Sequence, residues 1–532
     1  MKLFEQNNAQ KLKELSQICT KNAFHGLRFG LHNRRGIHGA CPWELLHAIL
    51  LGIFKYVRDC FFEQIGPSSA TADEINSLAV IIGSLFARQS DRNKPRTKFA
   101  KGILKGKLMA KEYTGVLLVM AAILRCQSGK DILKSARKKN FKEDWLIKDW
   151  ILLVETLLQW EAYLNLPRME KKDLQRLKRK HKFLMYLLIK VGNRTTGMGF
   201  KVMKVHAMLH LVIDILMFGV PMVVDTGSNE SHHKKTKVAA KLTQKDIKTF
   251  EKQTSNRMDD FHVLDLAMEE IEGRPLWKYL FGYYHEEIPQ VEKIKKTGGM
   301  TFNVFVEDPV EKVVGVRVVT RMNNPESLMF DTQMLHFAMK IQHDIAHLLP
   351  KMPVCAEHSR DGYMFRSHPN YRSKGPWRDW VMINWDEGDF PALIWGFVDL
   401  RTLPEGLQVD LTIGKTVERG VYAIVESCLY VDEEMPESDI FIPLILETDE
   451  LNASGEVVVR RFYLVDVETF QEPLVVIPNI GANPKCQYLR MIPRSKWAED
   501  FKAWIGLPHD LDEEEMAPPL PTREEEEEGQ ED

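Results

Sequence analysis

A glutamate beside basic residues is the segment with the strongest chemical character. Glu230 follows the turn-forming run Asp225-Thr226-Gly227-Ser228-Asn229 and precedes His232-His233-Lys234-Lys235-Thr236-Lys237. Metal-dependent phosphoryl transfer on DNA needs a carboxylate to hold Mg²⁺ and basic groups to hold phosphate. From spacing alone, the favoured interpretation is simpler. Glu230 would lie in the first turn of a helix capped by Ser228 or Asn229.

Two further segments carry histidine at helical spacing. His206 and His210 are four residues apart, which places both imidazoles on one face of a helix. Zinc sites use such pairs but need further ligands, and Ala207 stands where the metalloprotease motif has glutamate. The sequence therefore predicts no zinc, and a packed or DNA-facing pair. Glu44 and His47, three apart, share a helical face in the same way, which is common in partly buried helices.

Basic residues recur around these segments and in residues 98–118. No GxxxxGK[ST] sequence occurs, which excludes a P-loop. The lysines of 98–118 could follow a nucleic-acid backbone or form a solvated loop, and charge alone does not separate the two interpretations. The predicted nucleic-acid-binding set is Lys98, Lys101, Lys105, Lys107, Lys201, Lys204, His206, His210, His233, Lys234, Lys235 and Lys237.

The elements that position these residues are mainly helical from 1 to 290. Apolar residues recur at helical spacing in 43–60, 72–87, 114–125, 146–164, 183–191 and 201–218. Residues 171–182 predict an exposed basic helix, and 243–271 predict another helix. Breakers such as Gly66-Pro67 and Gly219-Val220-Pro221 separate these stretches.

The pattern changes near residue 300. Residues 291–354 predict a connector with strands at 301–306 and 313–319 and a helix at 325–349. Short strands at 380–385, 391–398, 421–431, 440–446, 457–466 and 474–477 predict a small β-barrel or β-sandwich over 355–506, which a helix at 494–505 closes. Residues 507–532, with runs of glutamate, predict a disordered acidic tail. The fold class is therefore α+β and multidomain.

Charge is divided unevenly along the 532 residues. Residues 1–300 hold 51 Lys and Arg against 31 Asp and Glu; the totals of 72 and 74 leave 21 against 43 for the rest. This asymmetry indicates a polyanion-binding part joined to an acidic regulatory or solubilising part. Seven cysteines without a CxxC pair, and a start unlike a signal peptide, indicate reduced thiols in an intracellular protein. No apolar run approaches the 18 or so residues of a membrane helix.

Four segments in order over residues 30–250 resemble the C-terminal part of transposases of the CACTA (En/Spm-like) superfamily, including its Plavaka-type group. The first is Trp43-Glu44-Leu45-Leu46-His47 before an apolar helix, and the second is residues 107–113. The third is a helix ending in "FGxP", matched by Lys204, His206, His210, Leu211, Phe218, Gly219 and Pro221. The fourth is Glu230 with the basic residues up to Lys237.

This resemblance implies an RNase H-like core in which two aspartates and one glutamate bind Mg²⁺. Glu230 matches that glutamate, and the helices before it match an insertion. The aspartates are expected upstream of Glu44, where this chain has little sequence, and Glu44 stands where the family often has aspartate. The resemblance thus implies a truncated, catalytically incomplete transposase. Asp225 is the second carboxylate that a residual Mg²⁺ site with Glu230 would use.

The implied location is the nucleus, and the implied partner is DNA, with a full-length transposase or a second copy of the chain as further partners. A membrane and a small-molecule substrate are not expected. A surviving transposase site predicts Mg²⁺ binding that depends on Glu230. A non-catalytic DNA- or chromatin-associated protein predicts salt-sensitive binding without metal. A scaffold whose basic half binds an acidic partner, or its own tail, predicts weak DNA binding that improves when residues after 508 are deleted.

Overall fold

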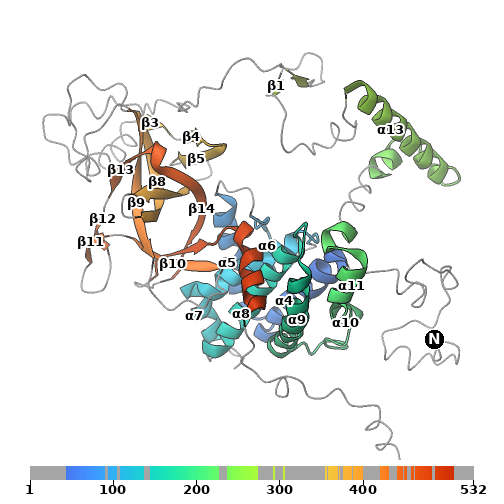
Figure 1. Cartoon of the computed structure of the whole chain (residues 1–532), viewed down its shortest axis with the longest axis horizontal. Helices are drawn as coiled ribbons and strands as arrows, with labels where there is room; N and C mark the ends of the chain where they lie inside the picture. Colours follow the sequence, from blue (N-terminus) through green and yellow to red (C-terminus); the bar gives the residue numbers. More distant parts are fainter. Residues whose placement is uncertain are drawn as a thin grey trace, which may run out of the picture. The chain divides into compact units, whose positions relative to one another are not determined.

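The computed structural model describes residues 44–89, 94–104, 108–136, 144–226, 236–272, 291–293, 303–305, 354–355, 357–368, 371, 376–385, 388–399, 420–430, 440–446, 448–451, 457–460, 462–481 and 486–507. The chain forms two compact units (Figure 1). Unit 1 comprises Met1–Val224 and Val316–Asp532, and unit 2 comprises Asp225–Gly315.

The first part of unit 1 is helical, as the apolar spacing predicts. Its elements are η2 (Leu45–Phe54, a π-helix), α4 (Lys55–Ile65), α5 (Ala70–Ala87), α6 (Glu112–Arg125), α7 (Gln127–Ser135), α8 (Asp144–Leu164), α9 (Lys171–Gly192), α10 (Met203–Met208), α11 (Leu211–Phe218) and η4 (Pro221–Val224). Every residue of α6 from Glu112 to Leu124 is buried, which makes α6 the central helix. A helix that is apolar on all sides must be surrounded by other elements, whereas its neighbours bury one side.

Two predicted helices have different bounds in the structure. Residues 171–182 and 183–191 form the single helix α9, because Leu174, Leu177, Leu184 and Leu188 continue one buried stripe along it. Residues 201–218 form α10 and α11, with Leu209 and His210 between them.

Two glycines allow an extended segment to lie close against the helices. A Cβ atom on Gly83 of α5 would lie 2.3 Å from the backbone oxygen of Thr97, and one on Gly115 of α6 would lie 1.8 Å from that of Arg96. Only glycine fits such an approach. The segment that carries Lys98 and Lys101 is therefore fixed across α5 and α6.

The second part of unit 1 is a closed six-strand β-barrel, one of the two architectures that the short strands predict. Its antiparallel strands, in order, are β9 (Val421–Tyr430), β10 (Phe441–Leu446), β15 (Tyr488–Met491), β14 (Phe470–Pro478), β7 (Trp380–Trp385) and β8 (Gly388–Asp399). Pairing of β8 with β9 closes the ring. The remaining elements are β3 (Val354–Cys355), β4 (Glu357–Arg360), β5 (Tyr363–His368), β6 (Trp377–Arg378), β11 (Thr448–Leu451), β12 (Val457–Arg460), β13 (Tyr463–Asp466) and η8 (Val467–Thr469).

Alternation along the strands separates two buried faces. On β14, Leu474 and Val476 belong to the apolar cluster shared by the barrel strands, whereas Val475 and Ile477 belong to the core of the helical part. Successive side chains of a strand point to opposite faces, so one strand serves both cores. Phe441 of β10 also belongs to the helical core and packs against Phe86 of α5, with ring centroids 6.3 Å apart.

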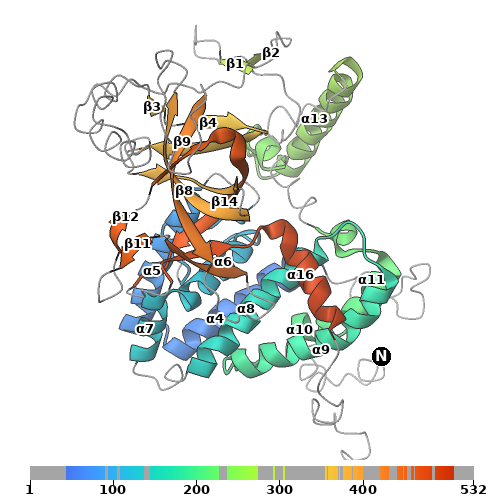
Figure 2. The same cartoon turned by 60° about the vertical axis from the view of Figure 1, so that its left-hand side comes forward.

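Polar contacts fix the barrel to the helices. Gln89 exchanges two hydrogen bonds with the backbone of Val476, and the amide of Ser128 donates to the oxygen of Ile480 at 2.6 Å. The predicted closing helix is present as α16 (Arg494–Gly506), and it packs on α8 and α9 (Figure 2). The helices and the barrel thus form one packed body.

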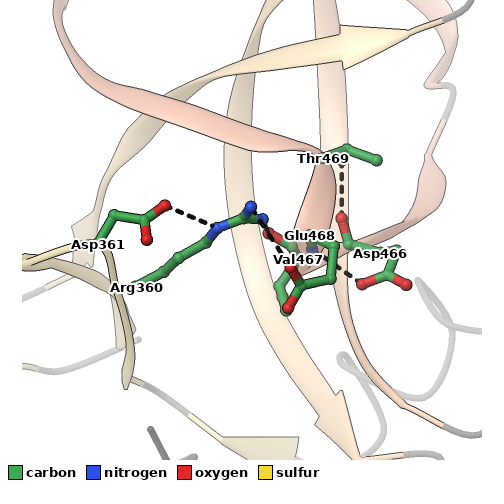
Figure 3. A network of polar contacts seen from close by, with 6 residues as sticks. All are labelled: Arg360, Asp361, Asp466, Val467, Glu468 and Thr469. Carbon is green, nitrogen blue, oxygen red and sulfur yellow. Dashed lines mark hydrogen bonds and ion pairs between the residues drawn. The ribbon is translucent and has the colours of Figure 1, made fainter.

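A separate polar network holds the β4–β5 turn against η8 (Figure 3). Arg360 donates to Asp361 at 3.1 Å and to the backbone oxygen of Val467, and lies 3.4 Å from Glu468. Asp466 caps η8 by accepting from the amide of Glu468 at 2.9 Å. All of these groups hold backbone or one another, which is a structural task.

Unit 2 contains α13 (Phe250–Glu272) and the antiparallel pair β1 (Val291–Lys293) and β2 (Asn303–Phe305). The predicted helix at 243–271 is present from Phe250, after a turn at 247–249, and β2 lies within the predicted strand at 301–306, whereas the sequence does not predict β1. The predicted strand at 313–319, the helix at 325–349 and the acidic tail beyond residue 507 lie outside the described residues.

One described helix, α5, is long and apolar enough to cross a membrane by length and composition alone. Its first turn is capped by Ser69, and Ile75, Ala79, Ile82 and Phe86 are fully buried in the core of unit 1. These contacts are typical of a core helix that packs against its neighbours.

Candidate nucleic-acid interface

The structure describes some of the residues that the sequence predicts to bind nucleic acid or metal. Lys98, Lys101, Lys201 and Lys237 are exposed. The remaining predicted residues described here are Glu44, His47, Lys204, His206, His210 and Asp225. Glu230, His233, Lys234, Lys235, Lys105 and Lys107 lie outside the described residues, so a carboxylate site that combines Glu230 with Asp225 stays a prediction.

Glu44 is the N-cap of the π-helix η2. Its carboxylate accepts from the amides of Leu46 at 2.8 Å and His47 at 2.6 Å, and it also contacts the Nδ1 atom of His47. An anionic cap satisfies amides that have no partner inside the helix. The first motif of the family resemblance therefore has a local structural task at this position.

The first and third motifs of the resemblance are in contact. Lys204 of α10 lies over Gly52 of η2, where a Cβ atom would come within 2.8 Å of the lysine Cδ atom. Its Nζ atom donates to the backbone oxygen of Leu51 at 3.1 Å. Burial, with the nearby Lys55, lowers the pKa of Lys204, and Glu44 opposes this shift. Lys204 thus joins α10 to η2 and is only partly available to a ligand.

His206 and His210 lie side by side in solvent at the junction of α10 and α11. Their Nε2 atoms are 3.4 Å apart, and both residues are exposed. The sequence predicts this pairing from the four-residue spacing.

The outer side of α9 is a basic surface. Its 22 residues include eight Lys or Arg and one Asp. Lys178, Arg179 and Lys182 are exposed, and none of the three has a carboxylate partner among the described residues. These three side chains are referred to below as the α9 basic face.

The inner side of α9 is fixed by α16. The Nζ atom of Lys502 lies 3.2 Å from a carboxylate oxygen of Glu170 and 3.1 Å from one of Asp173. These partners raise the pKa of Lys502, while Lys172 and Lys502 lower that of Glu170. Lys180 lies over the ring of Trp504 at 5.2 Å. Asp173 and Lys180 thus contact α16, whereas Lys178, Arg179 and Lys182 face solvent on the other side of α9.

His181 lies on the buried side of α9. Its ring packs on Trp160 of α8, with centroids 5.4 Å apart, and burial lowers its pKa to about 4 despite the nearby backbone of Met208. Neither ring nitrogen has a hydrogen-bond partner within the described part of the chain. His181 is therefore neutral at pH 7. The nearness of Met208, the last residue of α10, shows that α9 passes beside α10.

The tryptophans of the barrel have separate partners. Trp380 packs against Tyr488 and Trp385 against Tyr463, each with centroids 4.9 Å apart. Trp395 donates its indole N–H to Glu426 at 2.8 Å. An aromatic cage requires several exposed rings around one cation, and these rings instead fill the core or bind neighbouring side chains.

Three buried thiols lack the features of a nucleophile. Cys60, Cys126 and Cys428 are buried, and burial raises the pKa of Cys60 to about 12 and of Cys126 to about 11. A reactive cysteine needs a lowered pKa and access to solvent.

No protein-family model, no curated protein and no solved structure matches this chain. The arrangement of its own residues is therefore the basis for assigning a function.

Proposed function

We propose that this protein binds double-stranded DNA through the α9 basic face. The observation that carries the proposal is the exposure, on one side of a long helix, of Lys178, Arg179 and Lys182 without carboxylate partners among the described residues. Cations held in this way attract the phosphates of a duplex, and binding releases the counterions that those phosphates had condensed.

The form of the helix favours a duplex over a single strand. The α9 basic face spans residues 178–182, about 6 Å along a rigid helix, so its cations are held close together against the closely spaced phosphates of a duplex. Proteins that bind single strands without sequence preference stack bases on aromatic side chains. On α9, Tyr186 is an exposed aromatic side chain, and the Nζ atom of Lys190 lies 5.9 Å from the centre of its ring. Because that ring already contacts a lysine, it does not offer the series of open aromatic faces that stacking of single-stranded bases requires.

The narrower form of the proposal is the transposase-like one. In that form the helices belong to a DNA-handling protein with an RNase H-like core, and Glu230 with Asp225 would supply carboxylates for Mg²⁺. A Mg²⁺-dependent change in DNA binding or strand cleavage that Glu230→Gln removes is expected in this case. DNA binding that ignores both Mg²⁺ and Glu230 favours a non-catalytic DNA- or chromatin-associated protein.

The test is DNA binding by the full chain across a salt series. The variant Lys178→Gln/Arg179→Gln/Lys182→Gln should lower the slope of log affinity against log salt by about 2.7, since each phosphate contact contributes about 0.9. The matched control is Lys241→Gln/Lys248→Gln/Lys252→Gln, which removes the same charge from exposed positions of unit 2.

If both triple variants change the slope equally, net charge rather than α9 governs binding, and the proposal is wrong. Absence of binding by the wild type at low salt also overturns it and favours the acidic-partner scaffold.

A further inference from the structure

We propose that His206 and His210 form a two-imidazole chelate for a divalent transition-metal ion, with Zn²⁺ as the ion to test first. The proposal is independent of the α9 basic face. The sequence argues against zinc because a histidine pair lacks the further ligands of a structural zinc site. The geometry instead suits a site in which two imidazoles supply two ligands and water molecules supply the others.

The distance between the rings fits a shared ion. Their Nε2 atoms are 3.4 Å apart. Two nitrogens that each lie about 2.0–2.1 Å from one ion, at a roughly tetrahedral angle, are about 3.3–3.4 Å apart. The separation lies beyond the range of about 2.7–3.2 Å that most N–H···O hydrogen bonds show, and it fits an intervening ion.

The orientation of the rings supports the same conclusion. The ring centroids are 5.2 Å apart and the planes lie at 69°. Because the centroids are farther apart than the Nε2 atoms, the rings converge through those nitrogens. Both residues are exposed, and within the described part of the chain their side chains contact each other.

The chemistry of the donors selects the class of ion. Neutral imidazole suits Zn²⁺, Cu²⁺ and Ni²⁺, whereas Mg²⁺ prefers oxygen ligands and keeps its waters. The described residues contain no group of three His, Cys, Asp or Glu that could hold a metal. Water or an oxygen of a bound anion would therefore complete the coordination, and we expect weaker binding than at a four-ligand site.

The test is calorimetric titration of the full chain with ZnCl₂, compared with His206→Ala, His210→Ala and His262→Ala. His262 is exposed on α13 and has Met258 and Leu266 one turn away, so it is a single histidine matched in exposure. Wild type and His262→Ala should share one bound equivalent that either of the other variants loses. An excess of Mg²⁺ should leave that equivalent unchanged.

A second measurement identifies the donors. Electron paramagnetic resonance of one equivalent of Cu²⁺ should show two imidazole nitrogens in wild type and His262→Ala, and fewer in His206→Ala or His210→Ala. Equal zinc stoichiometry in all four proteins, together with the same nitrogen count, would show that the rings only contact each other, and the proposal would fail.

Discussion

On α9, Lys178, Arg179 and Lys182 point into solvent without carboxylate partners among the described residues, whereas two carboxylates of the barrel region, Glu426 of β9 and Asp379 directly before β7, are buried and hydrogen-bonded. Glu426 is 1% exposed and accepts the indole N–H of Trp395. Asp379, also 1% exposed, accepts the amide of Arg366 at 2.7 Å. Buried charge requires such partners because leaving water is costly.

This difference shows how the two regions are to be interpreted. A buried carboxylate with its hydrogen bonds made is explained by the fold around it, so Glu426 and Asp379 call for no external ligand. An exposed cation with no internal partner contributes little to stability. Such a cation is available to a partner outside the chain, which is why α9 carries the proposed function.

The strongest test of this comparison concerns the junction of the two regions. Glu155, 2% exposed, binds Arg125 through two 2.8 Å hydrogen bonds and accepts the amide of Ile440 from the barrel side at 3.1 Å. Glu155→Ala leaves the arginine without this partner and should lower the free energy of unfolding by about 3–5 kcal/mol. Urea denaturation followed by far-UV and near-UV circular dichroism measures the loss in helices and aromatic core together.

The control is Asp260→Ala, which breaks an exposed ion pair with Arg257 at 3.0 Å and should cost at most about 1 kcal/mol. Two separate transitions in Glu155→Ala, with the barrel signal unchanged, would contradict the single packed body.

The next largest effect is acid destabilisation through His181. Its pKa is about 4 in the folded chain and about 6.5 when unfolded. The unfolded state takes up the proton first, so stability is full above pH 6.5 and falls as the pH drops towards 4, by about 3 kcal/mol in total. His181→Leu should flatten this part of the pH profile, measured by urea midpoints between pH 7 and pH 4.

The control for His181 is His262→Leu on α13, an exposed histidine that should leave the profile as in wild type. If His181→Leu loses as much stability between pH 7 and pH 4 as wild type, another group causes the acid destabilisation and the prediction for His181 is wrong.

The sequence predicts the exposed side of α9 but not the contacts of its buried side. Its basic composition and the spacing of Leu174 and Leu177 predict an exposed basic helix, as observed. Which of those charges would be used internally could not be predicted, because Lys502 lies more than three hundred residues away. Local spacing contains no signal for an ion pair formed by packing of distant elements.

The barrel shows the same limit. Alternation predicts most of its strands, but Val475 and Leu474 are both apolar, and their order does not tell which one faces the helices. Trp497 and Phe501 predict one buried side of α16, although its partners are α8 and α9. For Glu44, the sequence predicts a place on one helical face with His47, whereas the structure places it before the helix as the N-cap; its position directly before an apolar helix is the signal of that role.

Within the barrel, a smaller effect is expected from Trp395→Phe. The change keeps an aromatic ring but removes the N–H that binds Glu426 at 2.8 Å. A buried carboxylate that loses a donor costs about 1–3 kcal/mol. Urea denaturation measures the loss, and the slope of DNA affinity against salt should stay as in wild type. A change in that slope would show that the barrel binds DNA and would break the comparison.

The smallest effect should come from the cap of η8. Asp466→Ala removes the oxygen that accepts from the amide of Glu468 at 2.9 Å, while Arg360 keeps its bond to the backbone of Val467 (Figure 3). Loss of an N-cap costs typically about 1 kcal/mol. Asp466→Asn, which keeps an accepting oxygen, should restore most of that stability in thermal unfolding. If Asn stabilises no better than Ala, the negative charge of Asp466 matters more than its accepting oxygen, and the barrel surface would then use charge for its fold even where water competes.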